Sequence, residues 1–140
     1  YMNDQTVKAN QVITIPLNEK QPAVLKAVSE DFSYGLLFSI VAKSEETFIN
    51  DIALQINHLV KFSLINKKAD GFLGLYKLRK KDVFTTKHQS SYMVFIISGA
   101  FEVNDRLLES RDALLMEHTE LIDFEALSNN ALMLIIELTT

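Results

Sequence analysis

Short apolar runs, many with apolar residues at every second position, recur along the chain and are separated by polar segments. A spacing of two is typical of half-buried β-strands, because successive side chains point to opposite faces of a sheet. A helical spacing occurs only at residues 23–29, after Pro22, where we expect one short helix. The pattern predicts strands at residues 11–16, 34–41, 51–59, 60–65, 72–78, 92–97, 101–103, 107–108, 113–116, 122–126 and 131–138.

The polar segments between these runs predict turns. Residues 66–71 end in Asp-Gly, and Asn104 with Asp105 suits the positive φ angles of a tight hairpin turn. We also expect turns at 80–82 and 128–130. Many short strands with regular turns predict an antiparallel sandwich or barrel, and the lack of crossover helices argues against a parallel α/β sheet.

Composition narrows the class of protein. The 140 residues are 48% hydrophobic, which is enough for one compact domain with its own core. The net charge is −4, and the one basic cluster, residues 77–81, has no aromatic or glycine-rich companion, so we expect no nucleic-acid partner. The absence of cysteine excludes disulfides and thiolate chemistry, and no apolar run is long enough to span a membrane. We therefore expect a soluble, cytoplasmic protein without a membrane partner. Since residue 1 is Tyr, either a short scar precedes a start at Met2 or the chain is a piece of something longer.

One group of residues carries a family resemblance. Thr86, His88, Tyr92 and Gly99 are spaced like the first motif of the cupins. Further blocks follow in the family's order, and the whole resembles the C-terminal cupin domain of pirin-like and quercetinase-like bicupin proteins. Those blocks are residues 70–71, 75–78, 92–104, 107–115, 124–127 and 134–138.

The resemblance implies an all-β fold, a cupin-type antiparallel double-stranded β-helix (jelly-roll barrel) with at most one or two short helices in the N-terminal half. We expect residues 1–140 to form a single cupin-like domain. Residues 70–138 are its family-matching core, and residues 1–60 supply additional strands of the same sandwich, because their apolar faces need a partner surface. The sequence departs from the family where Asp105 replaces a turn glycine and Arg111 replaces the glycine of a Gly-Asp pair.

The departures matter most at the ligand positions. A metal-binding cupin carries three His and one Glu in its two motifs, and here Thr86, Tyr92 and Ile122 stand at three of these four positions. Only His88 is of ligand type, and neutral hydroxyl groups are poor metal ligands near neutral pH. These replacements therefore lead us to expect no metal and no cofactor. His58 and His118 could replace a missing ligand, but His118 lies four residues before Ile122 and would need a shifted strand.

A metal-free enzyme is a further possibility, because some cupin-type sugar epimerases use a His with an acidic partner. His88 could be a general base if Glu102, Asp112 or Glu117 oriented it, but the alternation places Glu102 on the opposite face from Phe101 and Val103. The charges at Glu109, Arg111 and Asp112 are interpreted as turn-forming. We therefore name no catalytic residue.

We expect a cupin domain without a complete metal site that is structural or binds a small molecule, and we favour this over an enzyme. Its ligand pocket would lie in the barrel at Thr86, His88, Tyr92 and Ile122. The alternatives are a metal-dependent dioxygenase like the quercetinases, a metal-free isomerase or epimerase, and the ligand-sensing barrel of a regulator. Because cupins commonly pair through an edge strand, we expect a homodimer.

Overall fold

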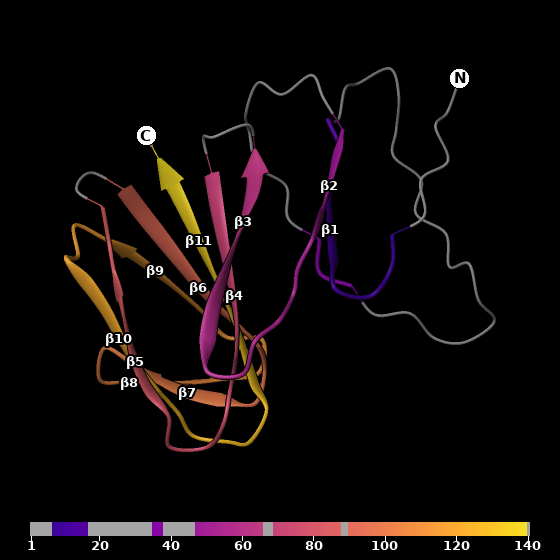
Figure 1. Cartoon of the computed structure of the whole chain (residues 1–140). Coiled ribbons are helices and arrows are strands. Elements are labelled where there is room, and N and C mark those ends of the chain that lie inside the picture. The colour runs from indigo at the N-terminus through magenta and orange to yellow at the C-terminus, as the bar shows by residue number, and fades with distance from the viewer. Residues whose placement is uncertain (1–6, 17–34, 38–46, 66–68, 88–89, 140) are drawn as a thin grey trace. The chain divides into compact units, whose positions relative to one another are not determined.

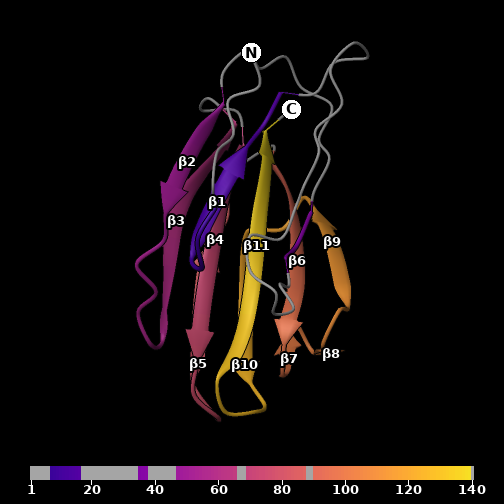
Figure 2. The same ribbon diagram turned by 90° about the vertical axis from the view of Figure 1, so that its right-hand side faces the viewer.

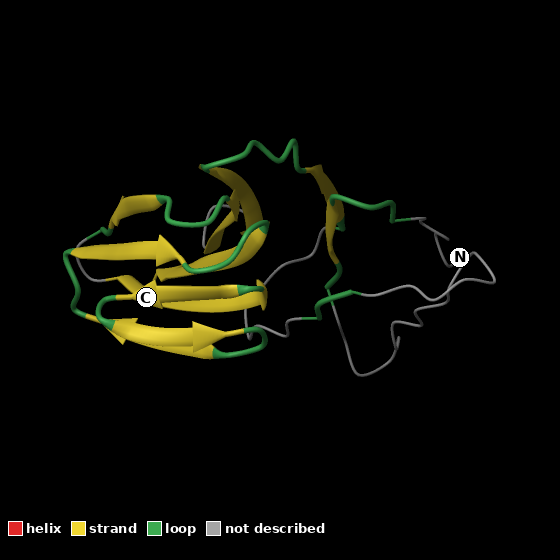
Figure 3. Ribbon diagram, turned by 90° about the horizontal axis from the view of Figure 1, so that it is seen from below, coloured by secondary structure: helices red, strands yellow, loops and turns green. Residues whose placement is uncertain are grey.

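The computed structural model describes residues 7–16, 35–37, 47–65, 69–87 and 90–139. The chain divides into two compact units, residues 1–51 and 52–140, and each is described by itself (Figure 1). The expectation of a single domain over residues 1–140 stays a prediction. All regular elements of the described residues are β-strands, as the colouring in Figure 3 shows. Within the described ranges no helix is long and apolar enough to cross a membrane.

The first unit contains a small two-stranded sheet. Strand β1 (Gln11–Thr14) pairs antiparallel with β2 (Phe48–Asp51), and the Gln11 side-chain amide donates a hydrogen bond of 2.7 Å to Asp51. The predicted strand at 11–16 is thereby confirmed. The short helix expected at 23–29 and most of the strand expected at 34–41 lie outside the described residues.

The second unit is a jelly roll of two antiparallel sheets. One sheet has the order β3-β4-β11-β6-β9 and the other β5-β10-β7-β8, so that the chain passes repeatedly between them (Figure 2). In the described part of the chain no strand pairing joins the two sheets, so the jelly roll is an open sandwich and not a closed barrel. The strands are β3 (His58–Ile65), β4 (Ala69–Tyr76), β5 (Lys81–Thr85), β6 (Ser90–Ser98), β7 (Ala100–Val103), β8 (Arg106–Glu109), β9 (Ala113–Glu117), β10 (Leu121–Ala126) and β11 (Ala131–Thr139).

The core lies between the two sheets. In β10 the alternation predicted from the sequence is confirmed, since Ile122, Phe124 and Ala126 are buried while Leu121 and Asp123 are exposed. The opposite sheet contributes fully buried side chains at alternate positions of β6 and β11. This arrangement removes apolar surface from water, and each Å² buried stabilises the fold by roughly 25 cal/mol. The burial is the main force that holds the two sheets together.

Two turns of the second half are also as predicted. Asn104 and Asp105 join β7 to β8 with φ angles of 44° and 61°, as a tight hairpin turn requires. Arg111, which replaces a family glycine, has a φ of 77°. At both replaced positions the backbone therefore keeps the left-handed conformation that glycine adopts most easily. Asp112 closes the second turn by accepting a 2.8 Å hydrogen bond from the Glu109 amide.

The turn predicted to end at Asp70-Gly71 is wrong, because both residues lie inside β4. Gly71 is opposite Phe62 of β3, and a Cβ at this position would overlap the Phe62 ring. Here glycine makes room for an aromatic side chain on the neighbouring strand, whereas in the sequence it looked like a turn residue.

The turn predicted at 80–82 is also wrong in its bounds. It ends at Lys80, and Lys81 already begins β5, a strand that the sequence did not predict. Val83 is exposed while Asp82 and Phe84 are partly buried. Asp82 accepts a 2.9 Å hydrogen bond from the hydroxyl of the fully buried Tyr76. A charged residue on the inner side of the strand obscured its alternation.

Candidate functional site

A row of paired residues crosses one end of the five-stranded sheet. In register from β4 through β11 and β6 to β9, Asp70 is opposite Glu137, Glu137 opposite Tyr92, and Tyr92 opposite Met116. Directly opposed residues of an antiparallel sheet project from the same face. Since Tyr92 belongs to the core between the sheets, this row lies on the inner face, and two carboxylates are placed there.

Glu137 is a buried carboxylate, with a relative exposure of 1%. The Lys87 ammonium lies 2.8 Å from Oε2, and the hydroxyls of Ser90 and Tyr92 each donate to Oε1 at 3.1 Å. Among the described residues no buried side-chain nitrogen or oxygen lacks a partner. Both carboxylate oxygens of Glu137 thus have partners within the protein, as a buried carboxylate requires.

Lys87 connects this carboxylate to a second one. Its ammonium is 3.6 Å from Asp70, which also forms a 2.6 Å ion pair with Lys61. The hydrogen bond to Glu137 raises the pKa of Lys87 above its usual value. The two lysines therefore balance the two carboxylates. We define the interior polar cluster as Lys61, Asp70, Lys87, Ser90, Tyr92 and Glu137.

Backbone contacts also hold the segment that carries Lys87. The Lys87 amide donates a 2.6 Å hydrogen bond to the Tyr92 hydroxyl, and the Ser90 amide donates at 3.3 Å to the Lys87 carbonyl. Burial is the main cause that raises the pKa of Tyr92, so its hydroxyl stays protonated at neutral pH and serves as a donor to Glu137.

The predicted pocket positions come together in part. Tyr92 and Ile122 are fully buried, and both adjoin Phe84, whose ring centroid is 5.7 Å from that of Tyr92. Thr86 lies two residues beyond Phe84, is partly buried and donates its hydroxyl to the Thr119 carbonyl. His88 lies outside the described residues. Whether these four positions line a ligand pocket stays a prediction.

Sequence reasoning missed the acid that lies beside Tyr92. Of the acids that were considered as partners of His88, Glu102 and Glu117 are exposed, and Asp112 closes a turn. The buried acid is Glu137, the one ionisable residue in the apolar run 131–138. Its alternation with the inward-facing Ile135 was a readable signal, because a charge at an inward position of a buried strand needs a partner.

The described residues do not fit a cupin-type metal centre. None of them form a group of three or more His, Cys, Asp or Glu side chains that could hold a metal ion. His58 and His118 are both exposed, and His118 has a φ of 55° at the end of β9. The oxygens of Glu137 accept hydrogen bonds from an ammonium and two hydroxyls, which leaves a donor set of the wrong kind for iron, nickel or zinc.

Comparison with known proteins agrees with the fold. YhhW from Escherichia coli superposes with a TM-score of 0.59 at 11% identity, over 66% of this chain and 43% of that one. A second structure, the bacterial pirin YhhW from Escherichia coli in complex with nickel(II), gives 0.59 at 9% identity, over 68% and 45%. The chain thus spans less than half the length of these proteins, and such low identities show the fold alone. No curated protein sequence matches.

The family follows from the sequence match. A model of the quercetinase C-terminal cupin domain matches residues 54–138, more than half of the chain. The match begins earlier than the resemblance found at 70–138 and includes β3, which forms one edge of the five-stranded sheet. The chain belongs to the family of quercetinase C-terminal cupin domains.

Proposed function

We propose that this domain is a metal-free, non-catalytic cupin domain with a structural role, as one half of a pirin-like bicupin arrangement. One observation carries the proposal: the buried carboxylate of Glu137 is neutralised by Lys87 and hydrogen bonded by Ser90 and Tyr92. A metal centre needs free donor atoms that converge on one point. In the described interior the ammonium of Lys87 supplies the positive charge that such an ion would bring.

The same contacts argue against acid–base catalysis at this cluster. A general base must reach its substrate and must have a pKa near the working pH. Tyr92 and Glu137 are almost completely buried, and the pKa values of Lys87 and Tyr92 are both raised away from neutrality. At neutral pH the lysine holds its proton in the ion pair and the tyrosine holds its own. Because both side chains keep their protons, the cluster is better suited to a structural role than to acid–base catalysis.

Metal analysis tests the proposal. The protein is produced with iron, nickel, manganese and zinc in the medium, purified without chelators, and assayed by elemental analysis. We expect substoichiometric metal in the parent protein and in His88→Ala alike. Stoichiometric metal that is lost in His88→Ala would overturn the proposal and favour the dioxygenase-type alternative.

A binding titration supplies the second readout. Adding nickel(II) or iron(II) to the purified protein should give no saturable heat, and Glu137→Gln should behave in the same way. A stoichiometric isotherm that Glu137→Gln abolishes would show that the carboxylate exchanges Lys87 for a metal, and the non-catalytic assignment would fail with it.

A further inference from the structure

A cleft of about 310 Å³ opens between two sheet edges, and none of its lining residues belongs to the interior polar cluster. One wall comes from β8, the last strand of the four-stranded sheet, with the hairpin turn before it. The other comes from β9, the last strand of the five-stranded sheet. Its volume is at the lower end of the range for small-molecule sites, roughly 300–1,000 Å³.

Arg106 brings a positive charge into this cleft. It is opposite Val103 in the β7–β8 hairpin, and Val103 is fully buried, so the Arg106 side chain leaves the sheet on the inward-facing side. Throughout the described ranges no carboxylate forms an ion pair with its guanidinium. An inward-facing guanidinium at an open edge is therefore available to an anion from solution.

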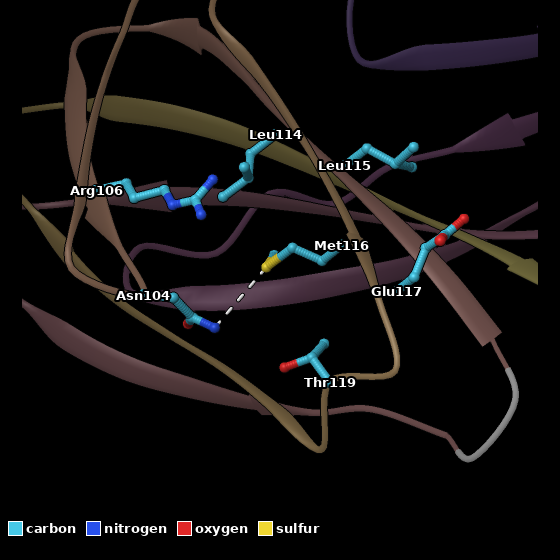
Figure 4. Close-up of a pocket in the computed structure, with 7 residues that line it drawn as sticks. All are labelled: Asn104, Arg106, Leu114, Leu115, Met116, Glu117 and Thr119. Atoms are coloured by element: carbon cyan, nitrogen blue, oxygen red, sulfur yellow. Dashed lines mark hydrogen bonds between the residues drawn. The ribbon is translucent and has the colours of Figure 1, made fainter.

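The wall opposite Arg106 is apolar. Leu114 and Met116 are paired with Val94 and Tyr92 of β6 and lie on the inner face, where they pack against the core. Figure 4 shows both side chains turned toward Arg106 and Asn104. Glu117 also lines the cleft, but its carboxylate points away from Arg106. Glu117 thus forms no ion pair with Arg106.

The polar wall is held in place by its own hydrogen bonds. Asn104 accepts a 2.8 Å hydrogen bond from the Asp123 amide and donates at 3.4 Å to the Leu121 carbonyl. Its amide nitrogen also lies 3.8 Å from the sulfur of Met116, across the cleft. These contacts hold the turn that precedes Arg106 and so fix the backbone from which its side chain extends.

We propose that this cleft binds a small organic carboxylate. The carboxylate would accept hydrogen bonds from the Arg106 guanidinium, whose fork of donors matches that geometry, and the apolar body of the molecule would lie against Leu114 and Met116. The site goes beyond the structural role proposed above. It is also independent of the metal analysis, since no residue of the interior polar cluster lines the cleft.

Hexanoate is a suitable probe, with hexanamide as its uncharged counterpart. Methyl NMR of the whole chain would follow Leu114 and Met116 during titration with each compound. We expect saturable shifts of these two methyl signals with hexanoate, at a dissociation constant in about the millimolar range, and at least about tenfold weaker binding of hexanamide.

Arg106→Gln should weaken hexanoate binding about tenfold, because it removes the charge-assisted hydrogen bonds. Lys80→Gln removes one exposed positive charge elsewhere and should leave the affinity unchanged. An unchanged methyl spectrum without ligand confirms that each variant folds. Absence of saturable shifts at Leu114 and Met116, equal binding of hexanamide, or wild-type affinity in Arg106→Gln would each overturn the proposal.

Discussion

At the scale of single residues, Gly71 of β4 is a position where steric space decides stability. Its place opposite Phe62 leaves no room for a Cβ, because that atom would overlap the Phe62 ring. We expect Gly71→Ala to lower the free energy of unfolding by about 1–3 kcal/mol, the usual cost of overpacking. Urea denaturation followed by circular dichroism measures the change.

A matched control is Gly35→Ala, since nothing lies within 4 Å of a Cβ at Gly35. That variant should stay within about 0.5 kcal/mol of the parent. Replacing the ring with a smaller side chain, by Phe62→Leu in the Gly71→Ala background, should recover part of the lost free energy of unfolding. If the two substitutions add without coupling, the steric explanation is wrong.

The Lys87–Glu137 pair makes a second prediction about single residues. Lys87→Met leaves a buried carboxylate without its ammonium and should destabilise the protein by about 1–3 kcal/mol. The expected loss is below that for a fully buried pair, because the Lys87 side chain is 59% exposed. Chemical denaturation at neutral pH measures it.

The double variant Lys87→Met/Glu137→Gln should be more stable than Lys87→Met alone, since it removes the uncompensated charge. Lys80→Met is the control, because Lys80 is exposed and forms no ion pair with any described residue. Equal stability of the single and double variants would mean that the uncompensated charge of Glu137 is not the cause of the loss.

At the scale of elements, two substitutions in the turn of the β7–β8 hairpin test backbone strain and side-chain contacts separately. Asp105 has a φ of 61°, and we expect Asp105→Gly to stabilise the protein by about 0.5–1 kcal/mol. Asn104 also has a positive φ, of 44°, but its side chain bonds Asp123 and Leu121. Asn104→Gly should therefore destabilise, and thermal unfolding would distinguish the two. A gain in both variants would refute the assigned role of the Asn104 side chain.

Elements whose signals are local could be read from the sequence. Strand β10 alternates buried and exposed residues within six positions, and the β7–β8 turn depends on two adjacent residues. Strand β5 and the start of β4 could not be read in this way, because their charged residues have partners on other strands. Asp82 accepts a hydrogen bond from Tyr76, and Asp70 forms an ion pair with Lys61. Such residues look like turn formers until the partner is known.

The candidate site shows the same division. The motif spacing led to Tyr92 and Ile122, which the structure places in one core. It did not lead to Glu137, which lies 50 residues from Lys87 and 45 from Tyr92 in the chain. Contacts over such distances are fixed by strand register, which depends on the pairing of whole strands and not on a local pattern.

At the scale of the whole molecule, each sheet of the open jelly roll ends in two edge strands. Among the described residues, β3 and β9 end one sheet and β5 and β8 end the other. Since unpaired edges favour association, we expect a homodimer that covers one of them. Light scattering coupled to size exclusion tests this, and a monomer at micromolar concentration would contradict it.

The pH dependence of stability is the broadest prediction. Burial, and then the hydrogen bond to Asp82, raises the pKa of Tyr76 above 10.0, and the bond to Glu137 raises that of Lys87 above 10.5. A raised pKa contributes stability that is complete below the unfolded value and is lost as pH rises through the folded one. We therefore expect urea midpoints to fall above about pH 10, and less steeply in Tyr76→Phe.

The acid side has the opposite sign. Hydrogen bonds from Arg79 and Lys81 lower the pKa of Glu125 below 4.5, so its contribution is present above that pH and is lost as pH falls through the lowered value. In a plot of the urea midpoint against pH, Glu125→Gln should flatten only the fall at acid pH. Tyr76→Phe should flatten only the fall at alkaline pH. Tyr76 and Glu125 lie on separate strands, and one loses its contribution as pH rises and the other as pH falls. A variant that flattened both falls would show that stability is lost through general charge repulsion and not through the hydrogen bonds of these two residues.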